Sequence, residues 1–116
     1  NVPNLAGVFG YINASWTLRV DIIGEYLTRL IRQMDVYGAV AATPVLPENA
    51  ALTAEDVFGD FTSGYLERGK DMMPRNGPSM PWRLNQEYRK DRMDMRQAPI
   101  DDGVLQFTRA KELVSA

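Results

Sequence analysis

The clearest hydrophobic pattern in the chain lies between residues 19 and 38. Apolar side chains recur there at the spacing of one helix face, in Val20, Ile23, Leu27, Leu30, Ile31 and Met34. The charged residues of this stretch are expected to point outward, and they are Arg19, Glu25, Arg29 and Arg32. Glu25 and Arg29 have the spacing of an ion pair within one helix. Gly38 can adopt the left-handed conformation that ends a helix. The pattern predicts one long amphipathic helix from Thr17 to about Tyr37, which needs a surface to cover its apolar side.

A continuous apolar run precedes this helix. Residues Leu5 to Gly10 follow Pro3 without any alternation of polar side chains. A strand of this kind is covered on both faces, as in a parallel sheet. No comparable run lies nearby in the chain. We therefore predict a buried strand of a parallel sheet, with its partner strands elsewhere in a longer polypeptide.

The middle of the chain predicts helices separated by breaks. Residues 39–54 indicate a connecting stretch, because two prolines interrupt any regular pattern. A second helix of about three turns is predicted from Thr62 or Ser63. A third helix is predicted from near Ser79, with Pro81 in its first turn.

The end of the chain predicts a turn and a strand. The sequence Asp-Asp-Gly at 101–103 favours a turn, and residues 104–107 are typical of a short strand. The expected fold class is therefore an α/β fragment, mostly helical with a few short strands.

Composition excludes several kinds of chemistry. The 116 residues contain no cysteine and no histidine, which removes disulfides, thiolate nucleophiles and thiol or imidazole metal sites. It also removes Ser-His and Cys-His catalysis. We assign no catalytic residue and no metal ligand within the chain. The absence of cysteine is compatible with the cytoplasm, which is the expected location.

Charge gives no reason to expect nucleic acid as a partner. The net charge is −2, from 13 basic and 15 acidic residues. A basic stretch contains Arg83, Arg89, Lys90, Arg92 and Arg96, but Glu87, Asp91 and Asp94 are interleaved with it. We expect an exposed, ion-paired face rather than a phosphate-binding patch. No apolar run approaches the roughly 20 residues of a membrane span. The chain opens on Asn1, with no initiator methionine and no signal-peptide pattern, and runs directly into an apolar stretch. This favours a segment cut from a longer polypeptide over a natural start from which the methionine has been removed.

The candidate binding site lies between the apolar run and the long helix. A predicted strand, a loop of small residues and a helix N-terminus together provide free backbone N–H groups and the positive end of the helix dipole. Such a site suits an anion or the polar edge of a ring. Gly10 allows close approach of the backbone, and Asn13 or Ser15 could cap the helix. The simpler alternative is that these residues only turn the chain and cap the helix.

The chain resembles flavin-containing monooxygenases of the Baeyer–Villiger type, the group that includes the ethionamide-activating enzymes. The first block of similarity is Gly-Tyr-Ile-Asn-Ala-Ser-Trp-Thr-Leu-Arg-Val-Asp at 10–21. Further blocks lie at 62–68, 73–77, 81–88 and 101–107, in the same order as in that family. Together they cover nearly the whole chain, which is more specific than any single motif.

The resemblance implies a place for each part of the chain. Residues 1–38 would be the last strand and helix of a Rossmann-like FAD-binding domain, and residues 39–116 a C-terminal extension of two helices and a short strand. The cofactor-binding residues would be Asn13, Ala14, Ser15, Trp16 and Thr17, facing the pyrimidine end of the flavin ring. The implied cofactors are FAD and NADPH. The implied reaction inserts one oxygen atom of O₂ into a ketone or a soft heteroatom of a small organic substrate.

The chain lacks parts that such an enzyme needs. No G-x-G-x-x-G fingerprint for FAD or NADPH occurs in it, so we expect the isolated chain to be inactive and to retain neither cofactor. Two alternatives remain open, a free-standing and mostly helical interaction module and an inactive relic of such an enzyme. Open sheet edges would favour self-association in either case.

Overall fold

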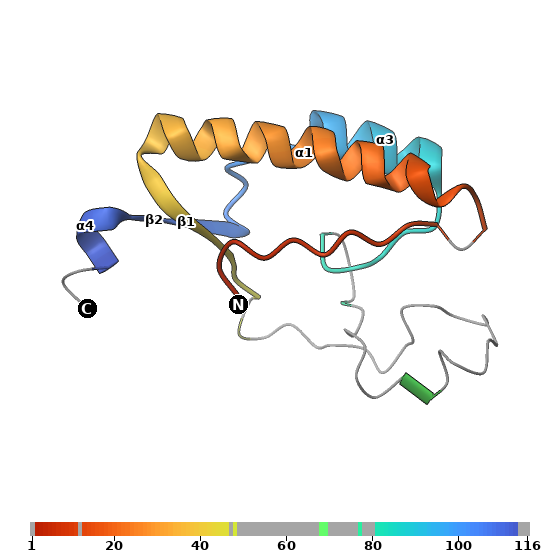
Figure 1. The fold of residues 1–116 in the computed structure, drawn as a ribbon, viewed down its shortest axis with the longest axis horizontal. Coiled ribbons are helices and arrows are strands. Elements are labelled where there is room, and N and C mark those ends of the chain that lie inside the picture. Colours follow the sequence, from red (N-terminus) through yellow and green to blue (C-terminus); the bar gives the residue numbers. More distant parts are fainter. Residues whose placement is uncertain are drawn as a thin grey trace. The chain divides into compact units, whose positions relative to one another are not determined.

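The computed structural model of the chain describes residues 2–11, 13–46, 48, 68–69, 77 and 81–113. The chain divides into two compact units, one formed by residues 1–46 and 86–116 and the other by residues 47–85. The first unit contains the named elements of Figure 1, which are α1 (Trp16–Tyr37), β1 (Ala39–Pro44), α3 (Tyr88–Gln97), β2 (Leu105–Arg109) and α4 (Ala110–Leu113). This arrangement agrees with the predicted α/β class of mixed helices and short strands.

The long helix predicted from the apolar periodicity is confirmed as α1. It ends at Gly38, which has a φ of 60° and donates its backbone N–H to the carbonyl of Asp35 at 3.1 Å. Glycine adopts this left-handed conformation without the steric penalty that a Cβ atom brings. The predicted end of the helix at Gly38 is therefore confirmed, and so is its cause, the left-handed conformation of this glycine.

The side of α1 that is covered differs from the predicted stripe. Ile22 is buried, whereas Val20 and Ile31 of the predicted stripe are 37% and 59% exposed. The helix packs instead against α3, which lies beside it in Figure 1. Part of the predicted apolar stripe thus remains uncovered within the described residues.

Charged side chains join α1 to α3. Glu25 accepts two hydrogen bonds from Arg96, both of 2.6 Å. Arg29 donates to the carbonyls of Met95, Arg96 and Ala98 at 2.7, 3.0 and 2.5 Å, where the last carbonyls of a helix have no partner within it. The predicted pairing of Glu25 with Arg29 is therefore wrong, because each side chain reaches the neighbouring helix.

The strands β1 and β2 form an antiparallel two-stranded sheet, in which Ala42 lies opposite Phe107. The predicted strand at 104–107 is confirmed, with bounds shifted to Leu105–Arg109. Gly103 has a φ of 83°, and the Asp102 carboxylate accepts the backbone N–H of Val104 at 3.0 Å, which confirms the turn before this strand.

The prediction of a connecting stretch from residue 39 is wrong, because β1 occupies Ala39–Pro44. The sequence of this strand, Ala-Val-Ala-Ala-Thr-Pro, has neither strong alternation nor a run of large apolar side chains. Its pairing with a distant strand decides its conformation. Pro44 is tolerated because it is the last residue of the strand.

The predicted strand at Leu5–Gly10 is absent, since these residues have no regular secondary structure. Leu5 is 71% exposed and Val8 is 46% exposed. No parallel strand lies next to them within the part of the chain that the structure describes, and a strand needs a partner for its backbone groups. The prediction of a strand covered on both faces is therefore wrong for this structure.

Asn4 anchors this N-terminal segment to β1. Its backbone N–H donates to the carbonyl of Ala42 at 3.1 Å, and its side chain accepts the N–H of Ala42 at 3.0 Å. The side-chain amide also donates to the carbonyl of Val40 at 3.0 Å. The segment from Asn4 to Tyr11 therefore runs from the sheet to the first turn of α1 (Figure 1).

The third helix begins at Tyr88, so the predicted start near Ser79 is wrong for the described residues from Pro81 onward. Glu87 before it is extended, with φ −119° and ψ 104°. The carbonyl of Gln86 accepts a side-chain hydrogen bond from Asn13 at 3.2 Å. The backbone just before α3 is therefore non-helical and is hydrogen-bonded to a residue far away in the sequence.

Most of the second unit lies outside the described residues, and so does most of the predicted helix from Thr62 or Ser63. Arg68 and Gly69 are helical. The backbone N–H of Gly77 donates to the carbonyl of Trp82 at 2.7 Å. Among the helices of the described ranges, none is long and apolar enough to cross a membrane.

Candidate functional site

The five residues predicted to bind the cofactor lie together at the N-terminal end of α1. Asn13, Ala14 and Ser15 lead into the helix, and Trp16 and Thr17 begin it. All five are exposed. The sequence therefore locates a continuous, solvent-facing turn at a helix N-terminus.

The first turn of α1 presents backbone N–H groups with little competition from side chains. Ser15 occupies the N-cap position but makes no side-chain cap hydrogen bond, and its hydroxyl lies 3.0 Å from that of Thr17. The first turn contains no acidic residue. The amide of Asn13 donates to Gln86, so neither predicted capping side chain caps the helix. Open N–H groups and the helix dipole suit an acceptor edge or a negative charge.

Trp16 is held by the segment that leads to it. Its ring lies 4.7 Å from that of Phe9, centroid to centroid, with an interplanar angle of 60°. Gly10 is buried beneath it, and a Cβ atom added at Gly10 would lie 2.8 Å from the Cα atom of Trp16 and still closer to its indole ring. The close approach predicted at Gly10 is therefore an approach to the first residue of α1.

A buried polar cluster lies at the base of this turn. The Asp91 carboxylate of α3 forms an ion pair with Arg19 of α1, and the same oxygen accepts the Tyr11 hydroxyl at 2.6 Å. The Arg19 guanidinium also lies over the Tyr11 ring, 4.3 Å from its centroid. Tyr11, Arg19 and Asp91 are 2%, 4% and 3% exposed. Both charges of this ion pair are shielded from water, so removal of either side chain is expected to destabilise the fold strongly.

Comparison with known proteins gives the turn its context. MymA of Mycobacterium tuberculosis is 48% identical over 112 residues, AlmA of Acinetobacter baylyi 41% over 116 residues, and EthA of Mycolicibacterium smegmatis 40% over 115 residues. These matches cover 97%, 98% and 99% of this chain. The names of the three relatives describe FAD-containing or FAD-binding monooxygenases. The chain is homologous to a C-terminal segment of FAD-containing monooxygenases.

This homology confirms the predicted resemblance to flavin-containing monooxygenases. The chain spans 22%, 23% and 23% of the length of these three relatives. No protein-family model and no solved structure matches it significantly. The contact of Asn13, Ala14, Ser15, Trp16 and Thr17 with a flavin stays a prediction.

The buried polar cluster of Tyr11, Arg19 and Asp91 is not predicted from the sequence. Arg19 was expected to point outward and Asp91 to belong to an exposed ion-paired face, and both expectations are wrong. Arg19 shares one side of α1 with Ile22, Tyr26 and Arg29, at intervals of three and four residues. This second stripe, which has an arginine at each end, is the sequence pattern that could have predicted which side of α1 packs against another helix.

The titration of Tyr11 provides a test of the cluster. Burial, reinforced by the hydrogen bond to Asp91, raises the pKa of Tyr11 to about 12, from an ordinary value of 10.0. Because the folded-state pKa is the higher one, this stabilisation is complete below pH 10 and is lost as the pH rises through about 12.

We expect the absorbance of ionised tyrosine, followed through an alkaline titration, to show a late component whose amplitude Tyr11→Phe reduces. Burial of Tyr26 and the hydrogen bond of Tyr37 to Asp101 also raise the pKa of those tyrosines, so the test is the change in amplitude. A late component whose amplitude is the same in the wild type and in Tyr11→Phe would contradict the buried hydrogen bond.

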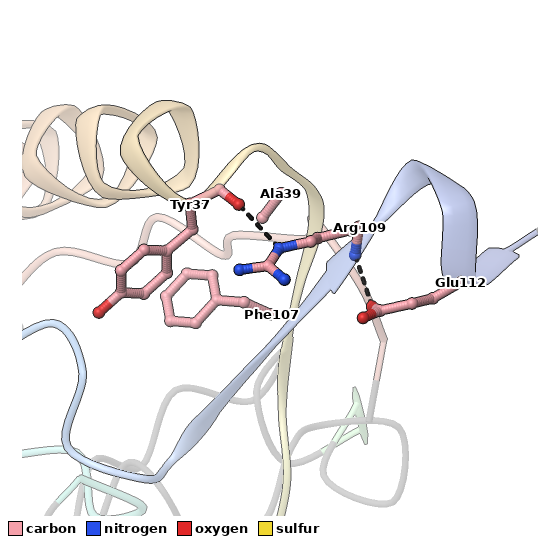
Figure 2. Close-up of a pocket in the computed structure, with 5 residues that line it drawn as sticks. All are labelled: Tyr37, Ala39, Phe107, Arg109 and Glu112. Atoms are coloured by element: carbon pink, nitrogen blue, oxygen red, sulfur yellow. Dashed lines mark hydrogen bonds between the residues drawn. The ribbon is translucent and has the colours of Figure 1, made fainter.

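A shallow pocket of about 310 Å³ lies at the opposite end of α1, as Figure 2 shows. Arg109 donates through its side chain to the carbonyl of Tyr37 at 3.1 Å and through its backbone N–H to Glu112 at 2.8 Å. The Tyr37 and Phe107 rings meet edge to face, with centroids 5.2 Å apart. These contacts join the sheet and α4 to the end of α1. None of the predicted site residues lines the pocket.

Proposed function

We propose that the chain forms the C-terminal part of an FAD- and NADPH-dependent monooxygenase. This enzyme inserts one oxygen atom of O₂ into a ketone or a soft heteroatom of a small organic substrate, in the cytoplasm. Residues 1–38 belong to its FAD-binding domain and residues 39–116 to a C-terminal extension. The observation that carries the proposal is the 40–48% identity, over nearly the whole chain, to three proteins named as FAD-containing or FAD-binding monooxygenases.

The turn from Asn13 to Thr17 fits the acceptor edge of a flavin. FAD, when bound, supplies the transfer of electrons from NADPH to O₂. The chain's own contribution is the row of backbone N–H groups at the start of α1, without an acidic side chain in the first turn. Reduced flavin carries negative charge at its pyrimidine end, which a helix N-terminus stabilises. The role of the turn is therefore to bind and orient this end of the ring.

The exposed apolar side chains of α1 support a larger assembly. Val20 and Ile31 lie on one side of this helix and are 37% and 59% exposed. In the proposed enzyme the remainder of the FAD-binding domain covers this surface. A free-standing interaction module would also need to cover it, but the homology favours the enzyme.

A charge placed at the N-cap distinguishes a flavin-facing turn from a helix cap alone. Aspartate is as good an N-cap as serine and interacts favourably with the helix dipole, so Ser15→Asp is expected to leave the stability of α1 unchanged or higher. The same charge opposes the negative charge of reduced flavin. We expect the midpoint potential of FAD in the native flavoprotein to fall by about 30 mV for each 1.4 kcal/mol of repulsion.

The matched control is Ser15→Asn, because asparagine is an equally good N-cap without a charge. It is expected to leave the potential near that of the wild type. Equal potentials in the aspartate and asparagine variants would mean that the turn lies far from the flavin.

A further inference from the structure

We propose that Asp91 is a positioning residue for the flavin-facing turn, holding both of its ends from α3. This inference rests on the proposed function, because the value of the turn depends on what it faces. The geometry itself belongs entirely to the first compact unit.

One carboxylate oxygen of Asp91 contacts the residues on both sides of the turn. Tyr11 precedes Asn13 and donates its hydroxyl to this oxygen at 2.6 Å. Arg19 follows Thr17 and forms its ion pair with the same oxygen. The two partners also contact each other, since the guanidinium lies over the Tyr11 ring. Asp91 thus fixes the entrance and the exit of the segment that carries the N–H groups.

The segment that leads into α3 also contacts the first residue of the turn. The carbonyl of Gln86 accepts the side-chain amide of Asn13 at 3.2 Å. The backbone N–H of Asp91 donates to the carbonyl of Glu87 at 3.0 Å, which continues the same segment into α3. Residues 86–91 therefore contact the chain just before the turn, at its first residue and just after it.

The charge of Asp91 also suits this location. Arg19 lies in the first turns of α1, where the helix dipole disfavours a positive charge, and it is 4% exposed. Asp91 lies in the first turn of α3, where the dipole favours a negative charge. Asp91 neutralises the positive charge of Arg19. The groups that the turn offers to a ligand are therefore its backbone N–H groups.

A simpler role for Asp91 would be to hold α1 against α3. The chain offers a matched control, because Glu25 and Arg96 join the same two helices through an exposed ion pair. Glu25 is eight residues beyond Thr17, about 12 Å along the helix axis. Glu25→Gln therefore weakens the helix contact without touching the turn, whereas Asp91→Asn acts on the turn directly.

The experiment measures backbone hydrogen exchange of residues 13–17, with and without FAD, in the native flavoprotein and its variants. In the wild type, FAD is expected to slow exchange in this segment. Asp91→Asn is expected to abolish most of this protection and to weaken FAD binding by about tenfold or more. Glu25→Gln is expected to keep the protection, with FAD affinity within about twofold of the wild type.

The outcomes separate the two proposals. Absence of FAD-dependent protection in the wild type would overturn the proposed function of the turn. Protection in the wild type that persists in Asp91→Asn, or is lost equally in Glu25→Gln, would overturn the positioning role alone.

If Asp91→Asn does not fold, the Tyr11→Phe variant tests the positioning role of Asp91 instead. It keeps the ion pair and removes only the hydrogen bond at the entrance of the turn. It is expected to reduce the protection of residues 13–17 while leaving the later turns of α1 unchanged. Unchanged protection in Tyr11→Phe would contradict the inference.

Discussion

Replacement of Asp91 by alanine is expected to lower the free energy of unfolding by about 3–5 kcal/mol. The substitution removes the carboxylate that forms a buried ion pair with Arg19, which is 4% exposed. It also removes the acceptor of the Tyr11 hydroxyl. Breaking a buried ion pair costs far more than the loss of an exposed one, for which about 0–1 kcal/mol is usual. Denaturant unfolding of the 116-residue chain, followed by circular dichroism, measures the difference.

The combined variant Arg19→Met and Asp91→Leu is the control for this prediction. Removing both charges together leaves neither charge of the ion pair buried alone, although the Tyr11 hydroxyl still loses its acceptor. The loss of stability is therefore expected to be below the sum of the two single losses. A cost below about 1 kcal/mol for Asp91→Ala would contradict a buried pair. Additive losses in the combined variant would contradict the coupling between the two side chains.

Substitution of Gly10 by alanine is expected to destabilise the chain by about 1–3 kcal/mol, because overpacking forces neighbouring groups to move. The added Cβ atom would approach the Trp16 backbone to 2.8 Å, and a backbone atom cannot move aside as a flexible side chain can. The first turn of α1 must shift to relieve this contact. We therefore expect FAD affinity to fall together with stability in the native flavoprotein.

Gly7 provides the matched control in the same segment. An alanine Cβ at Gly7 would meet nothing within 4 Å. Gly7→Ala is expected to leave FAD affinity unchanged and stability unchanged or slightly higher, by up to about 1 kcal/mol. Equal stability of the two alanine variants would contradict the close packing of Gly10 against Trp16.

The sequence predicted those elements whose conformation depends on local pattern. The helix α1 and its end at Gly38 follow from apolar periodicity and from the backbone freedom of glycine. The strand β1 could not be predicted in this way, since its alanine-rich sequence acquires a partner only through β2. Residues Leu5–Gly10 show the opposite case, in which a strand-like run has no adjacent parallel strand in the described part of the chain.

The location of the candidate site was predictable, but its support was not. Small residues before an amphipathic pattern indicate a helix N-terminus, and the structure places Asn13 to Thr17 there. The partner of Arg19 lies 72 positions away along the chain. No local pattern gives that pairing, so charged residues on the helix were interpreted as exposed. Burial of charge at such a distance depends on tertiary structure.

The most direct test of the proposed function is the intact mass and absorbance spectrum of the native polypeptide that carries this sequence in its source cells. We predict a polypeptide several times larger than 13.1 kDa that purifies with bound FAD. A native polypeptide of 13.1 kDa without flavin would contradict it and favour an interaction module or an inactive relic.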